Sequence, residues 1–138
     1  MKNSIYILNI AVAIILFTHA IPGIFDGGVN AFGKFFLNEI GFAPLGVPIA
    51  WAVKISHLIC ALLLLFNRYI KIAGLVTIAV LIMGIITVHF KEGWFVVGGG
   101  RNGVEYNFLL ICVLVVIMLA DKNKVTNKDL KSKESTSI

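Results

Sequence analysis

The side chains that could handle protons in this sequence are few, and they lie near the ends of long apolar segments. His19 lies in "FTHAIP", and Lys54 and His57 lie three residues apart in "AVKISHLIC". His89 and Glu105 bound the run "HFKEGWFVVGGGRNGVE". An imidazole gains or loses a proton near neutral pH, and a carboxylate can pass a proton on. These residue types favour proton handling or the binding of a polar group, and the segments that carry them decide where this can happen.

The composition indicates a membrane protein. Of the 138 residues, 59% are hydrophobic, whereas soluble domains are about 45–50% apolar. The mean hydropathy is +0.95. A helix of about 20 apolar residues crosses a bilayer core, and four segments are of about that length, namely 5–24, 47–66, 69–90 and 104–120. We predict an all-α integral membrane protein in which residues 1–120 form a bundle of four transmembrane helices.

The positive charges predict the orientation of this bundle. One side carries Lys2, Arg68, Lys71 and the basic tail, and the other carries fewer positive charges in longer loops. Positive charges collect on the cytoplasmic side, so both termini are expected there, in a multi-pass protein of a bacterial inner membrane. The tail, 121–138, is predicted to be disordered and to lie near anionic lipid. The net charge of +5 therefore indicates lipid rather than nucleic acid as a partner.

Two further features concern the first span and the loop after it. The N-terminal segment also has a Lys, an apolar run and small residues, as a cleavable signal peptide has, but its apolar run is longer than is usual there. In the first outer loop, Phe32, Phe35, Phe36 and Ile40 recur at helical spacing. This pattern predicts a short interfacial helix that lies on the membrane surface, and Gly33 leaves an irregular loop as the alternative.

Helix geometry places the polar residues near one level of the bundle. His89 and Glu105 are expected within a few Å of the outer boundary, His19 about 5–9 Å below it, and His57 about 13 Å below it. Charges inside a span usually pair or line a cavity, so we expect an outward-facing polar pocket with Lys54 paired to Glu105. Simpler explanations remain open, because Lys54 can snorkel to the headgroups and His57 can bond a neighbouring helix. His89 and Glu105 can also be ordinary boundary residues.

Four stretches give the chain a resemblance to the DoxX family of small four-helix bacterial and archaeal membrane proteins. They are "HAIPGIF", "HLICALLLLFNRY", "VHFKEGWF" and "GVEYNFLL", in this order over residues 5–120. The family often carries Glu in the second span at the position of His57, so a carboxylate-based role does not transfer to that position. The resemblance implies a four-helix membrane bundle and a link to quinone or thiol redox systems.

The residues and the resemblance together predict an accessory subunit of a membrane redox system, such as a quinone-linked oxidoreductase that needs a partner protein. The pocket would bind a quinone or quinol headgroup, with His57 and Glu105 as the catalytic, proton-handling residues. His19, Lys54, His89 and Arg101 would complete the binding site. Two alternatives stay open: a non-enzymatic module that binds or transports a small molecule or lipid, and a scaffold for a partner complex or a homo-oligomer.

Other cofactors are disfavoured by the sequence. His19 and His89 lie at similar depths and could ligate haem, but the histidines are better explained as pocket residues, and the c-type C-x-x-C-H motif is missing. No metal site is predicted. Cys60 and Cys112 lie in apolar segments outside any C-x-x-C motif, and they indicate buried small side chains rather than a disulfide framework.

Overall fold

The long apolar segments of the sequence all form helices. The computed structural model describes residues 2–98 and 101–136, with side chains for 4–98 and 101–121. Helix makes up 79% of the chain, and no described residue lies in a strand. The long helices are α1 (Lys2–Ala20), α3 (Gly46–Leu65), α4 (Ile70–Gly84) and α5 (Glu105–Thr136). The prediction of an all-helical chain is confirmed.

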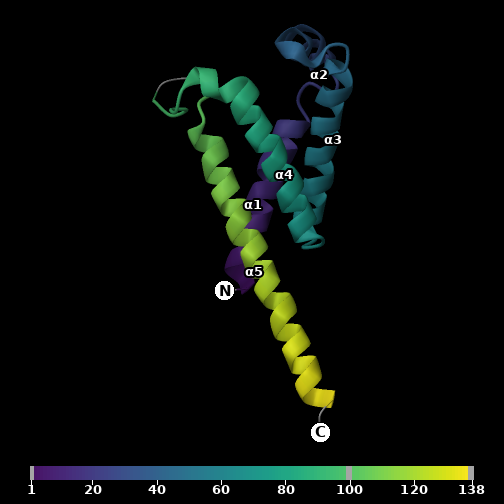
Figure 1. The fold of residues 1–138 in the computed structure, drawn as a ribbon, viewed down its shortest axis with the longest axis vertical. Helices are drawn as coiled ribbons and strands as arrows, with labels where there is room; N and C mark the ends of the chain where they lie inside the picture. Colours follow the sequence, from purple (N-terminus) through teal and green to yellow (C-terminus); the bar gives the residue numbers. More distant parts are fainter. Residues whose placement is uncertain (1, 99–100, 137–138) are drawn as a thin grey trace.

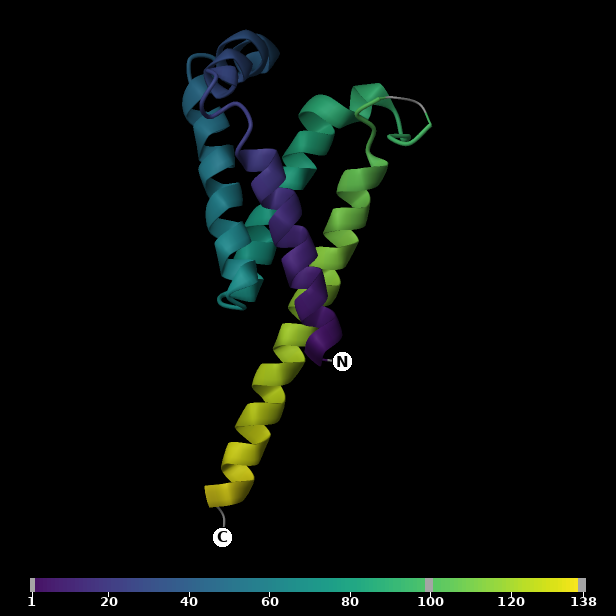
Figure 2. The same cartoon turned by 180° about the vertical axis from the view of Figure 1, so that it is seen from behind.

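The long helices alternate in direction, and both ends of the chain lie at the same end of the molecule (Figures 1 and 2). We call the opposite end the loop end, because α1 ends there, α3 and α5 begin there, and the two longer connections lie there. A single cluster of buried side chains joins the four helices. It contains Val12, Ala13, Leu16, Cys60, Ala61, Leu64, Ile70, Ala73, Leu81, Leu110, Leu114 and Ile117.

The first connection folds into a helical cap on the start of α3. It consists of α2 (Gly28–Phe32) and a π-helical segment, η1 (Gly33–Phe42). A side chain on Gly33 would lie 2.5 Å from the Cα of Val47, so the absence of one lets η1 lie directly on α3. The amide oxygen of Asn38 accepts a hydrogen bond from the backbone N–H of Gly46 at 3.0 Å. The helical character expected of this loop is therefore present.

The predicted apolar face of the cap is divided between two environments. Phe36 and Ile40 pack against its small core, but Phe32 and Phe35 are 44% and 63% exposed. The buried side chains are Val29 and Leu37. The prediction assumed 3.6 residues per turn, whereas a π-helix bonds residue i to i+5 and so changes which residues share a face.

The third long helix bends at the loop end. Its α-helical part, α4, ends at Gly84 and is followed by a π-helical segment, η2 (Ile85–His89), and one 3-10 turn, η3 (Phe90–Glu92). The predicted span of 69–90 was treated as one regular helix. Wider π turns shift the register of the residues after them, and they occur frequently at functional sites. Here the irregular part carries Thr87 and His89.

The fourth helix is longer than expected. The sequence predicts that the span ends at Ala120 and that a disordered tail follows, but α5 continues to Thr136. Adding a residue to an existing helix costs far less than starting one, and Asp121 and Asp129 precede Lys124 and Lys133 by three and four residues, a spacing that favours a helix. The predicted boundary at residue 120 therefore does not coincide with a helix end.

Among the residues whose side chains the structure describes, two helices are long and apolar enough to cross a membrane by length and composition. They are Gly46–Leu65, with a mean hydropathy of 1.9, and Ile70–Glu92, with 2.4. The apolar helix Ser4–Ala20 is slightly shorter than such a span. Membrane association is thus supported for the second and third predicted spans.

The close contact between the cap and α3 gives a prediction on stability. A Cβ on Gly46 would overlap the carbonyl oxygen of Gly33 and lie 2.5 Å from the Asn38 amide oxygen. We expect Gly46→Ala to destabilise the protein by about 1–3 kcal/mol, as overpacking does, in a thermal melt in detergent. Gly84→Ala is the control, because a Cβ there meets only ordinary contacts at 3.7 Å and the position is helical. Equal melting temperatures for Gly46→Ala and the parent would contradict the tight contact.

Candidate functional site

A cavity of about 980 Å³ lies at the loop end, and α1, α3, α4, η2 and α5 all contribute to its wall. In Figures 1 and 2, α3 and the η2 end of the third helix diverge toward the loop end. Four of the six predicted site residues line the cavity, while Glu105 and Arg101 do not. Its polar lining consists of Thr18, His19, Lys54, His57, Thr87, His89, Asn102, Tyr106 and Asn107.

His57 is the most deeply placed of the three histidines. It is only 4% exposed, on the face of α3 that looks toward α1. Its Nδ1 lies 2.7 Å from the carbonyl oxygen of Val53, one turn earlier in the same helix. Its ring centroid is 5.5 Å from that of His19, at the end of α1. The two rings form the part of the cavity wall that joins α1 to α3.

Lys54 holds the end of α1. Its ammonium nitrogen donates a hydrogen bond to the carbonyl oxygen of His19 at 2.6 Å. The last carbonyl groups of a helix lack partners within the helix and carry its negative dipole end, so a cation is stabilised there. The predicted pair of Lys54 with Glu105 is wrong. Lys54 bonds the backbone carbonyl oxygen at the end of α1, and Glu105 bonds backbone N–H groups of the loop before α5.

His89 stands on the opposite wall, at the end of η2. Its Nδ1 lies 2.6 Å from the carbonyl oxygen of Asn102, in the loop that leads into α5. Gly84, one π turn earlier, lies beside the ring, since a Cβ there would make ordinary contacts with the Cδ2 and Nε2 of His89 at 3.7 and 3.9 Å. The bond ties η2 to the loop and holds the ring at the cavity.

Glu105 fixes the loop that precedes it. One carboxylate oxygen accepts hydrogen bonds from the backbone N–H groups of Val96, at 2.7 Å, and Val97, at 2.8 Å. The two ends of this loop pass close to each other at Gly103. A Cβ there would lie 2.5 Å from the carbonyl oxygens of Trp94 and Phe95, so a residue without a side chain is needed. The acid at the start of α5 thus binds the loop main chain. The proton transfer assigned to it from the sequence stays a prediction.

Two buried asparagines were missed in the sequence. Asn107 is 6% exposed and lines the cavity two residues after Glu105. Asn9 is fully buried in α1, and its amide nitrogen donates to the side-chain oxygen of Asn67 at 3.1 Å. An amide inside an apolar segment needs a partner or a cavity, and this was the signal that could have identified both.

The cysteines do not form a bond with each other. Cys60 is buried in the core and Cys112 is exposed, and both are free thiols. Among the described residues, no group of three or more His, Cys, Asp and Glu side chains is placed to hold a metal ion. The His19–His57 contact also differs from the pairing of His19 with His89 that was weighed for haem.

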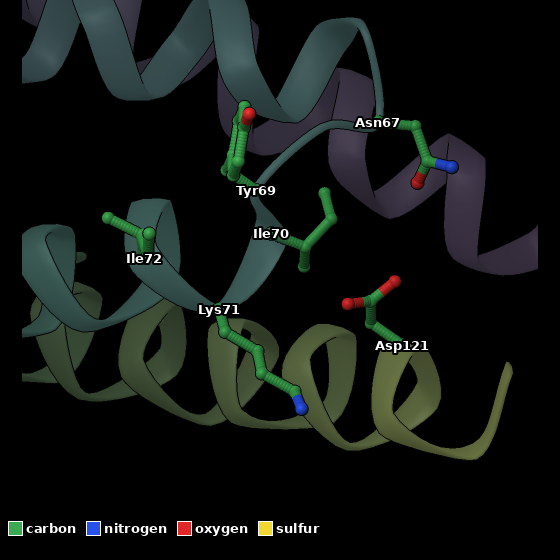
Figure 3. A pocket seen from close by; sticks show the side chains of 6 residues that line it. All are labelled: Asn67, Tyr69, Ile70, Lys71, Ile72 and Asp121. Carbon is green, nitrogen blue, oxygen red and sulfur yellow. The ribbon is translucent and has the colours of Figure 1, made fainter. Parts of the chain in front are cut away.

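A smaller pocket of about 300 Å³ lies at the end of the molecule that holds the chain termini. It is lined by Asn67, Tyr69, Ile70, Lys71, Ile72 and Asp121. Figure 3 shows Asn67 and Asp121 on either side of Ile70, at the start of α4. The pocket contains none of the histidines or other predicted site residues. The chemistry-bearing side chains therefore converge on the cavity at the loop end.

Comparisons with known proteins give no independent support for a family. No protein-family model, no curated protein and no solved structure matches the chain. The resemblance to the DoxX family rests on the four sequence stretches alone and stays a prediction.

The role of Glu105 as a clamp on the loop can be tested by hydrogen exchange. We expect Glu105→Ala to speed exchange at the amides of Val96 and Val97, because both lose their acceptor. Glu105→Gln should have a smaller effect, since its amide oxygen still accepts. Glu92→Ala is the matched control, an exposed acid in η3 just before the loop. Unchanged exchange in Glu105→Ala would show that the carboxylate does not hold the loop.

Proposed function

We propose that the chain is a four-helix transmembrane protein that binds the headgroup of a quinone or quinol in its loop-end cavity, as an accessory subunit of a membrane redox system. The observation that carries the proposal is the cavity itself. It brings all three histidines of the chain together with Lys54 and Asn107, within an otherwise apolar molecule. Ionisable groups are costly inside a membrane, and those that are present usually serve a function.

The membrane part of the proposal rests on the outward faces of the helices. Only 28% of the most apolar window of Gly46–Leu65 and 22% of that of Ile70–Glu92 are buried within the molecule. A core helix of a soluble protein would be mostly buried, whereas a helix that is apolar all round and exposed needs a lipid environment. Large apolar side chains such as Ile7, Ile86 and Leu109 are 65%, 62% and 58% exposed. Helices α1 and α5 would complete the set of four spans.

The distribution of positive charge sets the proposed orientation. Lys2, Arg68 and Lys71 belong to the end that holds the termini, and this end would face the cytoplasm of a bacterium. The cavity would then open toward the outer surface of the inner membrane. The cap formed by α2 and η1 would lie at that surface, where the exposed rings of Phe32 and Phe35 can enter the lipid.

The shape of the cavity suits an amphipathic ligand. Its volume lies at the upper end of the range of about 300–1,000 Å³ that is common for ligand pockets. The histidines and Lys54 provide hydrogen-bonding groups, and Ile15, Leu81 and Leu110 provide apolar wall. A quinone has a ring with two oxygen atoms and an isoprenoid tail, and it diffuses within the bilayer. Polar wall would hold the ring, and the apolar wall and lipid would hold the tail.

Each histidine has a role in this proposal. His57 and His89 would hydrogen-bond the oxygens of the ring from opposite walls, since both rings are oriented by backbone carbonyl groups. Lys54 would hold the end of α1 in place and bring positive charge to the site. Electrons would be exchanged with a partner protein. The resemblance to the DoxX family adds the redox context.

A lipid headgroup could use the same cavity, and in that case the chain would be a binding module without redox chemistry. A scaffold would need no ligand at all. Extraction of the purified protein separates the three alternatives, because they predict a bound quinone, a bound lipid or neither.

Topology is tested by labelling introduced cysteines from outside in a background without Cys60 and Cys112. We expect labelling of Phe25→Cys and Val97→Cys, because these side chains are 89% and 83% exposed in the two connections at the loop end. Asn123→Cys in the tail should be labelled only after the membrane is permeabilised. The reverse pattern would place the cavity on the cytoplasmic side.

Quinone binding is tested by mass spectrometry of the protein purified in mild detergent. We expect a near-stoichiometric quinone in the parent and in Ser56→Ala, whose side chain does not line the cavity. His57→Gln should lose the quinone while the melt changes little, because hydrogen bonds between membrane helices contribute about 0.6 kcal/mol on average. A parent protein without quinone, and unable to take up an added one, would overturn the proposed function.

A further inference from the structure

The hydrogen bonds of His57 and His89 determine which of their ring nitrogens carries a proton. In each ring, Nδ1 lies within 2.7 Å of a backbone carbonyl oxygen, that of Val53 or Asn102. A carbonyl oxygen can only accept, so Nδ1 must be the protonated nitrogen in both rings. In the neutral form of each ring, Nε2 then carries a lone pair and is an acceptor.

The surroundings of His57 favour that neutral form. The ring is 4% exposed, and Lys54 stands one turn earlier on the same helix, where its ammonium group repels a second positive charge. Within the described part of the chain, the Nε2 atoms of His57 and His89 have no hydrogen-bond partner. Both residues line the cavity. When these rings are neutral, each therefore keeps an Nε2 lone pair without a partner at a residue that lines the cavity.

Lys54 lines the same cavity and offers hydrogen-bond donors, whereas the two Nε2 atoms are acceptors. One of its N–H groups is used by the carbonyl oxygen of His19, and the ammonium group has two more. A ligand oxygen in this cavity thus meets acceptors on the histidines and a donor on Lys54. A hydroxyl group can donate to Nε2 and accept from Lys54 at once. A carbonyl oxygen can accept from Lys54, but it would turn a lone pair toward Nε2 of His57 or His89.

From this polarity we infer that the cavity selects the hydroxylated, reduced form of its ligand, a quinol, over the oxidised carbonyl form. The inference rests on the proposed quinone site and adds which redox state the site prefers. Leaving a buried acceptor unpaired weakens binding on the order of tenfold. Preference for the reduced form also raises the reduction potential of the bound couple, by about 30 mV for each tenfold of preference.

The test compares three ligands of one size on the full chain in detergent, without oxygen. They are a decyl-substituted benzoquinone, its quinol, and the dimethyl ether of that quinol, which can accept but cannot donate. We expect the quinol to bind about tenfold more tightly than the other two. Quinone binding equal to or tighter than quinol binding would overturn the inference and leave the proposed function standing. Binding of none of the three would overturn both.

Matched variants assign the preference to the histidine. His57→Gln should bring the ratio of quinone to quinol dissociation constants close to one, because an amide can turn to donate or to accept. Ser56→Ala should keep the ratio of the parent. Ser56 is the chain neighbour of His57 and donates to the same Val53 carbonyl, but it does not line the cavity. A full preference retained in His57→Gln would remove His57 from the selection.

Nitrogen NMR of the parent protein gives a second reading that needs no variant. In protein labelled at histidine, the neutral rings of His57 and His89 should each show a protonated Nδ1 and an unprotonated Nε2. Addition of the quinol should shift the Nε2 resonances, and addition of the dimethyl ether should not. A protonated Nε2 in the free protein would overturn the inference, whatever the binding constants.

Discussion

The arrangement at the loop end depends on one constraint, namely that four ionisable side chains there are bonded to main chain rather than to another side chain. Lys54 bonds the carbonyl group of His19 near the end of α1, and Glu105 bonds two backbone N–H groups of the loop before α5. His57 and His89 each bond a carbonyl oxygen. These bonds satisfy helix ends and loop groups that would be costly to leave unpaired in an apolar setting. They also fix the side chains without using up all of their hydrogen-bonding capacity.

The same bonds explain how a cavity persists between the helices. Lys54 joins α3 to the end of α1, and His89 joins η2 to the loop before α5, so each wall of the cavity is tied within itself. Across the gap, α1 and α5 share few contacts, while α1 and α3 share many. The π-helical segment at Ile85–His89 contributes by interrupting the regular helix before it reaches the loop. The polar side chains thus line a space instead of closing it.

The sequence was sufficient for the helices and for the level at which the polar residues gather, since both follow from apolar length and helix rise. It placed His19, Lys54, His57 and His89 around one pocket, and all four line the cavity. The sequence predicted the wrong partner for Glu105, because the prediction considered only side chains of opposite charge and not the backbone N–H groups. Backbone N–H groups of a loop compete with Lys54 for a carboxylate at a helix start. The position of these N–H groups depends on the close approach at Gly103 and on the path of the loop. The spacing of apolar residues in the sequence carries no information on either. The π turns of η1 and η2 were missed for a similar reason, since a 3.6-residue pattern cannot report a local change of period.

The difference between Glu105 and His57 shows why burial alone is a poor guide to function. Both are polar residues in apolar segments, and both were candidates for proton handling. Glu105 has two donors on one oxygen and stands outside the cavity wall, so its structural bonds account for its presence. His57 has one bond on Nδ1 and a second nitrogen that no described residue satisfies, in a ring that is 4% exposed. Because this residue lines the cavity and its second nitrogen has no partner among the described residues, His57, rather than Glu105, is the residue from which a ligand is inferred.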